Sequence, residues 1–177
     1  IRSGTYYWNG IEVRVYSATR KTGYVSLRML IDLKRMTSKY DLVHAHGFST
    51  LIPLVGSIVS NCDTPFVVNP HFHLNASKNS LAALKLIYEG IFGEHILNTA
   101  DKVICVSTTE KDHLLLKYQI SGNKIQIIPN GVNLAKIEGA IPYPDAEKCI
   151  LYIGRLERYK NVSRLVDAMR YLPDNYS

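Results

Sequence analysis

The sequence predicts an α/β fold: a parallel, Rossmann-like sheet with helices on both faces. Three observations support this. Short runs of β-branched and aliphatic residues alternate with segments of helical periodicity, the pattern of strand–helix–strand units. The 177 residues are 46% hydrophobic, which is ordinary for a protein with a buried core. Polar residues and glycines follow the predicted strands, where doubly wound sheets bind their ligands.

The elements follow from hydrophobic periodicity and from cap signals. We expect strands at 11–16, 41–45, 65–69, 102–106, 124–128 and 149–153. Helices are expected at about 24–38, 49–60, 80–98, 107–118 and 161–171, with a connection at 134–148. The first helix should carry Leu27, Leu30, Ile31 and Lys34 on one side.

Two helix starts have identifiable caps. Ser107 and Glu110 have the spacing of a capping box, in which each side chain satisfies one free backbone amide. Asn161 is expected to cap the last helix. Near the N-terminus, Tyr6, Tyr7 and Trp8 are expected to pack in a core or at an edge, the alternative being that they stack on a bound substrate.

The net charge of +6 is concentrated between Arg14 and Lys39, where seven basic residues accompany one acidic residue, Asp32. Such a window attracts phosphates, anionic lipid headgroups or nucleic acid, or is simply a solvated helix face. No basic and aromatic recognition motif accompanies it, so we do not expect a nucleic-acid partner. Three cysteines make no disulfide framework, and no apolar run reaches the roughly 20 residues of a membrane span. These two observations predict a cytoplasmic protein. If the basic residues between Arg14 and Lys39 bind lipid, it would be peripheral at the inner face of the membrane.

An anion site is predicted after the last strand. Gly154 ends that strand, Arg155 follows, and Lys160 precedes the final helix. Two cations beside a helix N-terminus favour a diphosphate, because the backbone amides and the helix dipole both attract negative charge. The alternative is an ordinary loop with exposed cations.

Five segments are informative when they are taken together and in order: 40–47 (YDLVHAHG), 65–73 (PFVVNPHFH), 100–110 (ADKVICVSTTE), 128–132 (IPNGV) and 154–162 (GRLERYKNV). Together they resemble the GT4-like family of retaining glycosyltransferases. The resemblance covers nearly the whole chain from about Asn9. It implies a GT-B enzyme in which one Rossmann-like domain binds the acceptor and a second binds a nucleotide sugar. The acceptor would be a glycan, a glycolipid or a lipid-linked sugar.

The resemblance also assigns site residues. Gly154, Arg155 and Lys160 would hold the donor diphosphate without a metal ion or other cofactor. One of His71 and His73 would line the cleft near the sugar, and we favour His73. Further cleft or hinge positions are His46, Gly47, Ser107, Asn130 and Gly131.

The sequence departs from the family pattern at both ends. The family's first strand and Gly-rich loop should precede Asn9, and its paired donor-site glutamates should lie beyond Ser177. We therefore expect residues 1–140 to form most of the acceptor domain and 141–177 the start of the donor domain. Such a chain should be inactive by itself, while the full-length protein should transfer a hexose from a nucleoside-diphosphate sugar.

Two other functions remain open. The chain could be a non-catalytic binding module of the same fold. Alternatively, the His-x-His pairs His44–His46 and His71–His73 could bind zinc in a metal-dependent hydrolase. His44 could also be a packed core histidine. Ser107 lacks the flanking glycines of a nucleophile elbow, so we expect no role for it as a nucleophile.

Overall fold

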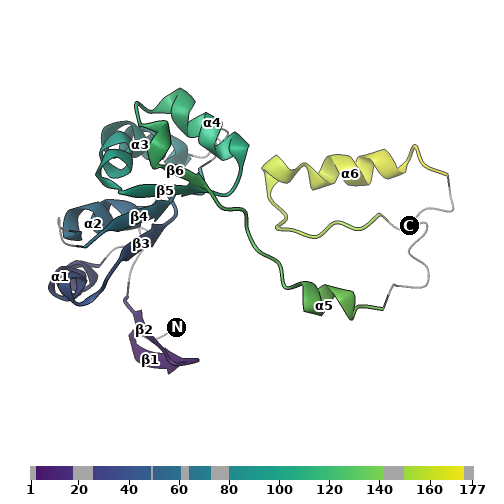
Figure 1. Ribbon diagram of the computed structural model, residues 1–177. Coiled ribbons are helices and arrows are strands. Elements are labelled where there is room, and N and C mark those ends of the chain that lie inside the picture. Colours follow the sequence, from purple (N-terminus) through teal and green to yellow (C-terminus); the bar gives the residue numbers. More distant parts are fainter. Residues whose placement is uncertain are drawn as a thin grey trace. The chain divides into compact units, whose positions relative to one another are not determined.

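The computed structural model describes residues 3–17, 26–48, 50–60, 64–72, 80–141 and 150–173 (Figure 1). The chain divides into two units, Ile1–Asn130 and Gly131–Ser177. The domain boundary expected at about residue 140 stays a prediction.

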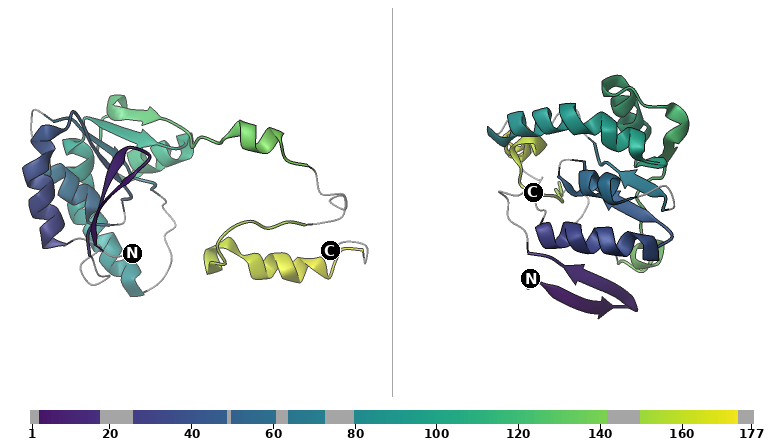
Figure 2. Two further views of the ribbon diagram at one scale, coloured as in Figure 1. Left: turned by 90° about the horizontal axis from the view of Figure 1, so that it is seen from below. Right: turned by 90° about the vertical axis from the view of Figure 1, so that its left-hand side faces the viewer.

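The first unit is built on a four-stranded sheet in the order β3 (Val43–His46), β4 (Phe66–Asn69), β5 (Lys102–Cys105), β6 (Ile125–Ile127). All three neighbouring pairs are parallel. The sheet is flanked by helices (Figures 1 and 2), which confirms the predicted α/β, Rossmann-like fold. The helices are α1 (Leu27–Met36), α2 (Ile52–Val59), α3 (Ser80–Thr99) and α4 (Thr108–Lys117), with short 3₁₀ turns η2 (Thr37–Lys39) and η3 (Gly122–Lys124).

The core lies against one face of this sheet. Ala45, Val68, Val103 and Ile125 are in register across the four strands and are all buried. Since side chains alternate along a strand, their neighbours point the other way, and His44, Lys102 and Gln126 are exposed. The core is completed by aliphatic and aromatic side chains from the helices and loops, including Phe48, Phe72, Ile96, Leu97, Leu114 and Tyr118.

Helix α2 packs closely on the sheet because it carries a glycine at the contact. A Cβ atom on Gly56 would lie 2.7 Å from the Phe66 ring and 3.4 Å from the Ala45 methyl group. Phe66 itself is only 1% exposed, so its ring has little space to move. The glycine therefore sets the distance between α2 and the strands that end at the candidate site.

The N-terminal residues form a separate antiparallel hairpin of β1 (Gly4–Trp8) and β2 (Ile11–Val15). Trp8 pairs with Ile11, so Asn9 and Gly10 are the two loop residues. Both have positive φ (49° and 80°), as an Asn-Gly hairpin turn requires. The strand predicted at 11–16 is thus confirmed, but core packing of Tyr6, Tyr7 and Trp8 is wrong, because the short hairpin leaves all three exposed.

Helix α1 also differs from its prediction. Ser26 caps it by accepting a hydrogen bond from Met29 N. Leu30 and Leu33 are half-buried, whereas Leu27 and Ile31 are exposed. Only part of the expected apolar side therefore packs against the protein, and Leu27 and Ile31 face the solvent.

The second unit contains α5 (Leu134–Glu138), the 3₁₀ turn η5 (Arg158–Lys160) and α6 (Val162–Met169). The connection expected at 134–148 includes α5, and its part from 142 lies outside the described residues. The strand predicted at 149–153 is wrong for residues 150–153, which the structure describes without a strand. A strand needs a hydrogen-bonded neighbour, and the described residues of this unit include none. Asn161 precedes α6 with left-handed backbone (φ 54°, ψ 32°) and makes no side-chain cap, which corrects the prediction.

Candidate functional site

Three histidines gather where β3 and β4 end. His44 and His46 alternate along β3 and so project from the same face, with ring centroids 4.2 Å apart. His71 follows β4, and its Nε2 lies 3.5 Å from His46 Nδ1, within reach of a hydrogen bond when one ring donates. The parallel register pairs His46 with Asn69, which brings the two strand ends together.

The loops after these two strands are joined through their backbones. Gly47 N donates to Asn69 O at 2.9 Å, and Phe48 N donates to Pro70 O at 2.7 Å. Gly47 (φ 86°) and His71 (φ 50°) both adopt left-handed backbone. That conformation is ordinary for glycine but uncommon for histidine, so the ring of His71 is held beside His46 at some conformational cost.

A buried carboxylate fixes the loop that carries His71. Glu110 is 4% exposed. Its Oε1 accepts from Phe72 N at 2.6 Å and its Oε2 accepts from Val106 N at 2.7 Å. One side chain of α4 thereby joins the ends of β4 and β5.

This arrangement revises the capping box. Ser107 Oγ accepts from Glu110 N at 3.1 Å, as predicted for the N-cap of α4. Glu110, however, reaches the amides of Val106 and Phe72 and not that of Ser107. Because its hydroxyl is used in this way, Ser107 is part of the scaffold behind the histidines.

An aromatic cluster supports both loops. Phe48 follows β3, Phe72 follows β4, and Tyr118 follows α4. Their ring centroids are 5.6–5.9 Å apart with edge-to-face orientation. Lys117 Nζ lies 5.0 Å from the Phe72 centroid and 2.7 Å from Glu89 Oε2. The residues next to the histidines are thus held by packed side chains from α3 and α4.

The surroundings of His44 favour its neutral imidazole. Partial burial lowers the pKa of His44, and the neighbouring His46 lowers it further. Asn69 lies beside His46 in the register and is 8% exposed, yet its Oδ1 accepts no hydrogen bond from the described residues. A buried amide oxygen without a donor is costly, so this position suits a ligand or a water molecule that donates one.

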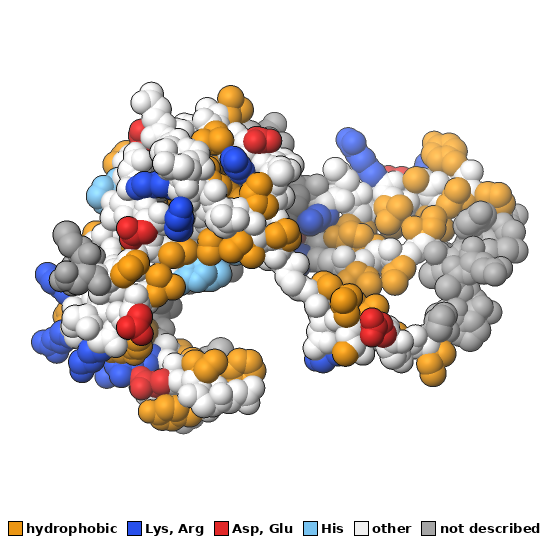
Figure 3. All heavy atoms as spheres, viewed as in Figure 1, with side chains coloured by type: hydrophobic (Ala, Val, Ile, Leu, Met, Phe, Trp, Pro, Cys, Tyr) orange, Lys and Arg blue, Asp and Glu red, His pale blue; other side chains and the backbone are white. Residues whose placement is uncertain are grey.

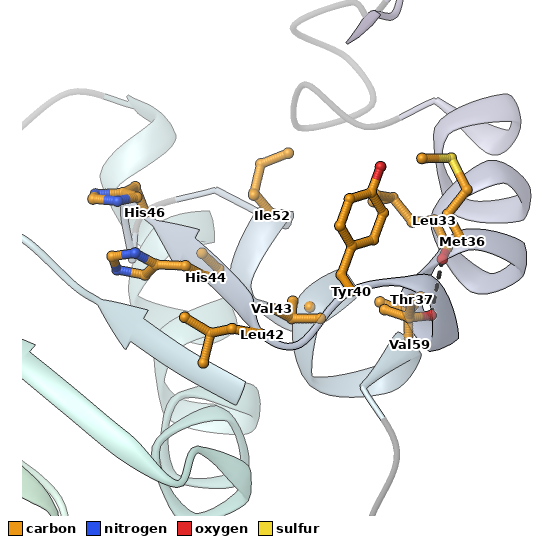
Figure 4. Close-up of a pocket in the computed structure, with 12 residues that line it drawn as sticks. Leu33, Met36, Thr37, Tyr40, Leu42, Val43, His44, His46, Ile52 and Val59 are labelled. Atoms are coloured by element: carbon orange, nitrogen blue, oxygen red, sulfur yellow. Dashed lines mark hydrogen bonds between the residues drawn. The ribbon is translucent and has the colours of Figure 1, made fainter. Parts of the chain in front are cut away.

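A hollow of about 380 Å³ lies beside the histidines, between α1, β3 and α2 (Figure 4). Its walls are largely apolar and include Leu33, Met36 and Ile52. Figure 4 shows His44 and His46 side by side at one end, and Tyr40 nearer to α1. The site therefore combines ionisable rings with an apolar recess.

The predicted diphosphate residues lie in the second unit. The Arg155 side chain is 79% exposed and its Nη1 lies 3.4 Å from Glu157 Oε1. A Cβ atom at Gly154 would lie 2.7 Å from the Tyr152 hydroxyl, which donates to Arg155 O. Lys160 ends η5, two residues before α6 begins. Arg155 and Lys160 thus stand on the segment that leads into a helix N-terminus.

The remaining predicted positions are only partly described. Asn130 and Gly131 are exposed and lie on either side of the division between the units. His73 lies outside the described residues. Among the residues that the structure describes, no three His, Cys, Asp or Glu side chains are placed to hold a metal ion, and no helix is long and apolar enough to cross a membrane.

Comparison with known proteins now identifies the family. Residues 5–136 match the family described as Glycosyltransferase Family 4. The chain belongs to glycosyltransferase family 4. The match begins before Asn9, where the resemblance was thought to start, and it ends before Gly154. The assignment of the diphosphate residues therefore stays a prediction.

Two glycosyltransferases are similar to this chain. One is the Escherichia coli UDP-Gal:alpha-D-GlcNAc-diphosphoundecaprenol alpha-1,3-galactosyltransferase, 28% identical over 164 residues, with 84% of this chain and 41% of the relative covered. The other is an uncharacterized glycosyltransferase of Methanocaldococcus jannaschii, 26% identical over 150 residues, covering 74% of this chain and 36% of the relative. The chain thus spans less than half the length of either relative.

Sequence reasoning missed two features of this site. Glu110 was recognised as a helix cap, but its bond to Phe72 joins residues 38 apart and has no local signal. Asn69 was noted only as the end of a strand. Its unpaired buried oxygen follows from the packing around it, which a single sequence does not reveal.

Proposed function

We propose that this chain is the acceptor-side part of a retaining hexosyltransferase that uses a nucleoside-diphosphate sugar. The chain belongs to a glycosyltransferase family, and the E. coli relative is named for transfer of galactose from a uridine nucleotide to a lipid-linked sugar. UDP-galactose is therefore the first donor to test, and a glycan or a sugar on a polyprenyl diphosphate is the first acceptor. Such an acceptor would place the protein at the cytoplasmic face of a membrane.

The histidine cluster carries the proposal. Parallel sheets bind ligands beyond the carboxyl ends of their strands, and His46 and His71 meet at that edge, next to the unpaired oxygen of Asn69. Imidazole nitrogens and an amide oxygen can orient sugar and acceptor hydroxyl groups through hydrogen bonds. Of His71 and His73, one of which would line the cleft near the sugar, His71 lies in this cluster, and His73 lies outside the described residues.

Arg155 and Lys160 are proposed to act on the leaving group. In hexosyl transfer the bond between the anomeric carbon and the diphosphate oxygen breaks. The acceptor oxygen bonds to that carbon on the same face, and the proton of the acceptor hydroxyl passes to the departing diphosphate. Negative charge grows on the departing diphosphate. Two cations near a helix N-terminus would stabilise it, as a metal ion does in other transferases. We therefore propose a metal-independent reaction.

We also propose that this chain does not transfer sugar by itself, because it spans 41% of the E. coli relative. The test is calorimetric titration of the full-length protein with UDP-, GDP- and ADP-sugars in the presence of a metal chelator. We expect one nucleotide sugar to bind, and Arg155→Ala and Lys160→Ala to abolish that binding. Absence of binding for every sugar would contradict the proposal, and binding that needs a metal ion would contradict its metal independence.

A further inference from the structure

The first helix has an unusual solvent-facing side. At about 100° per residue, Lys34, Leu27, Ile31, Arg35 and Arg28 follow one another around about 120° of the helix circumference. All five are exposed, and Leu27 and Ile31 are 74% and 42% exposed. Two aliphatic side chains thus form an exposed stripe with cations on both sides, which we call the α1 stripe.

The charge of the α1 stripe is only partly neutralised. Asp32 lies 3.9 Å from Arg28, and Glu12 pairs with Arg14. Within the described residues, Lys34, Arg35 and the nearby Lys39 form no ion pair. In Figure 3 the Lys and Arg side chains gather over α1, at the lower left, with hydrophobic side chains among them. Arg20 and Lys21 lie outside the described residues.

The hairpin next to α1 exposes aromatic side chains. Trp8 and Ile11 are cross-strand neighbours beside the Asn9–Gly10 turn, and Tyr7 precedes Trp8. Tyr7 is 73% and Trp8 64% exposed. We call Tyr7, Trp8 and Ile11 the hairpin tip.

The hairpin and the helix are neighbours. Arg14 Nη1 in β2 lies 2.7 Å from Met36 Sδ in α1. A polar hollow is lined by Gly4 and Arg14 from the hairpin and by Arg28 and Asp32 from the helix. Both views of Figure 2 place the two elements together.

We propose that the hairpin tip and the α1 stripe together bind the surface of an anionic lipid bilayer. An interfacial helix carries an apolar stripe between cations, so that the aliphatic side chains enter the acyl boundary while the cations meet lipid phosphates. Tyr and Trp favour that same depth, because their rings are apolar and their polar atoms stay hydrated. A free phosphate ligand would explain the cations alone. A bilayer also explains the exposed Leu27, Ile31 and Trp8.

This inference rests on the proposed function, because binding to a membrane would bring the protein to a lipid-linked acceptor. It explains why the positive window coincides with exposed apolar side chains. Two signals act together here, electrostatic attraction and shallow apolar insertion, and neither alone gives strong binding.

The test uses Trp8, the only tryptophan in the sequence, as the reporter. The chain is titrated with vesicles of phosphatidylcholine containing phosphatidylglycerol, and with vesicles of phosphatidylcholine alone. We expect a blue shift of Trp8 fluorescence with the anionic vesicles, quenching by brominated acyl chains, and loss of binding at about 1 M salt, where the Debye length is about 3 Å.

Two variants separate the contributions. The double variant Lys34→Gln, Arg35→Gln should weaken partitioning onto anionic vesicles about thirtyfold. The control is Lys136→Gln with Arg164→Gln, which removes the same amount of exposed charge from the second unit and should leave partitioning unchanged. Leu27→Ser with Ile31→Ser should weaken it about tenfold. Circular dichroism of each variant verifies folding.

The outcomes distinguish the two proposals. Unchanged Trp8 emission with anionic vesicles would overturn the proposal of a membrane-binding surface. An equal loss of partitioning in the Lys136→Gln, Arg164→Gln control would overturn it as well. Concentration-dependent dimerisation without vesicle binding would also overturn it, in favour of a second copy of the chain. If the full-length protein transfers sugar to a soluble acceptor but does not bind vesicles, only the proposal of a membrane-binding surface is refuted. If it binds vesicles but no nucleotide sugar, only the proposed function is refuted.

Discussion

Removal of the Glu110 carboxylate is the most informative perturbation of the scaffold. The carboxylate is buried and accepts two short hydrogen bonds, from Phe72 N and Val106 N. Hydrogen bonds to a charged group contribute about 1.5–3 kcal/mol each. We expect Glu110→Ala to lower the free energy of unfolding by about 3–5 kcal/mol, a large fraction of a typical total of about 5–15 kcal/mol.

The isosteric variant isolates one of the two bonds. Glu110→Gln keeps one carbonyl oxygen but turns an NH₂ group toward the second backbone amide, so we expect a loss of about 2 kcal/mol. Ser107→Ala, which removes only the helix cap, should lose about 1 kcal/mol. The control is Glu94→Gln on the exposed side of α3, which should stay within about 0.5 kcal/mol.

Urea unfolding followed by circular dichroism measures all four variants. The order of destabilisation should be Glu110→Ala, Glu110→Gln, Ser107→Ala, Glu94→Gln. A Glu110→Gln variant as stable as the Glu94→Gln control would refute the claim that this carboxylate joins the ends of β4 and β5.

Three further predictions concern the first unit. Gly56→Ala should lower the unfolding free energy by about 1–3 kcal/mol in a thermal melt, because the new methyl group meets the Phe66 ring. Burial raises the pKa of Cys105 to about 12, so site-resolved mass spectrometry should find this thiol unmodified by iodoacetamide at neutral pH until the protein unfolds. Burial and the nearby Glu89 raise the pKa of Tyr88 to about 12. Because the unfolded chain loses the phenol proton at a lower pH than the folded protein, the free energy of unfolding should fall as pH rises from about 10 to 12. In urea unfolding over that pH range, Tyr88→Phe should reduce the fall.

The sequence predicted the elements whose signals are local. The four parallel strands and the helices α2, α3 and α4 lie close to their expected ranges, because buried runs of a single periodicity alternate with clear breaks. The Ser107 cap was also predictable, since three residues separate it from the amide that it satisfies.

The errors arise where contacts distant in sequence decide the outcome. Residues 150–153 have the composition of a strand, but pairing requires a neighbour. Asn161 has a side chain suited to capping, but its backbone is left-handed, not extended as at a usual N-cap, and the side chain makes no cap hydrogen bond. Leu27 and Ile31 were placed with Leu30 by periodicity alone, which identifies an apolar side without saying what covers it.

The same limit applies to the candidate site. His46 and His71 were expected at the cleft, and the structure places their rings close together, while their role in the site stays a prediction. Their support by Glu110, Phe48 and Tyr118 depends on packing between strands, helices and loops. A pattern read along one chain does not contain that information.

The most direct test of the central claim is to follow the anomeric carbon during transfer. The full-length protein is supplied with UDP-galactose, whose sugar is α-linked, and with an N-acetylglucosamine diphosphate carrying a short polyprenyl chain, and the product is examined by proton NMR. The proposed retaining mechanism predicts an α-linked galactose in the product, formed in the presence of a metal chelator and lost in the Arg155→Ala variant. A β-linked product would contradict retention, and absence of transfer from every nucleotide sugar would contradict the proposed function itself.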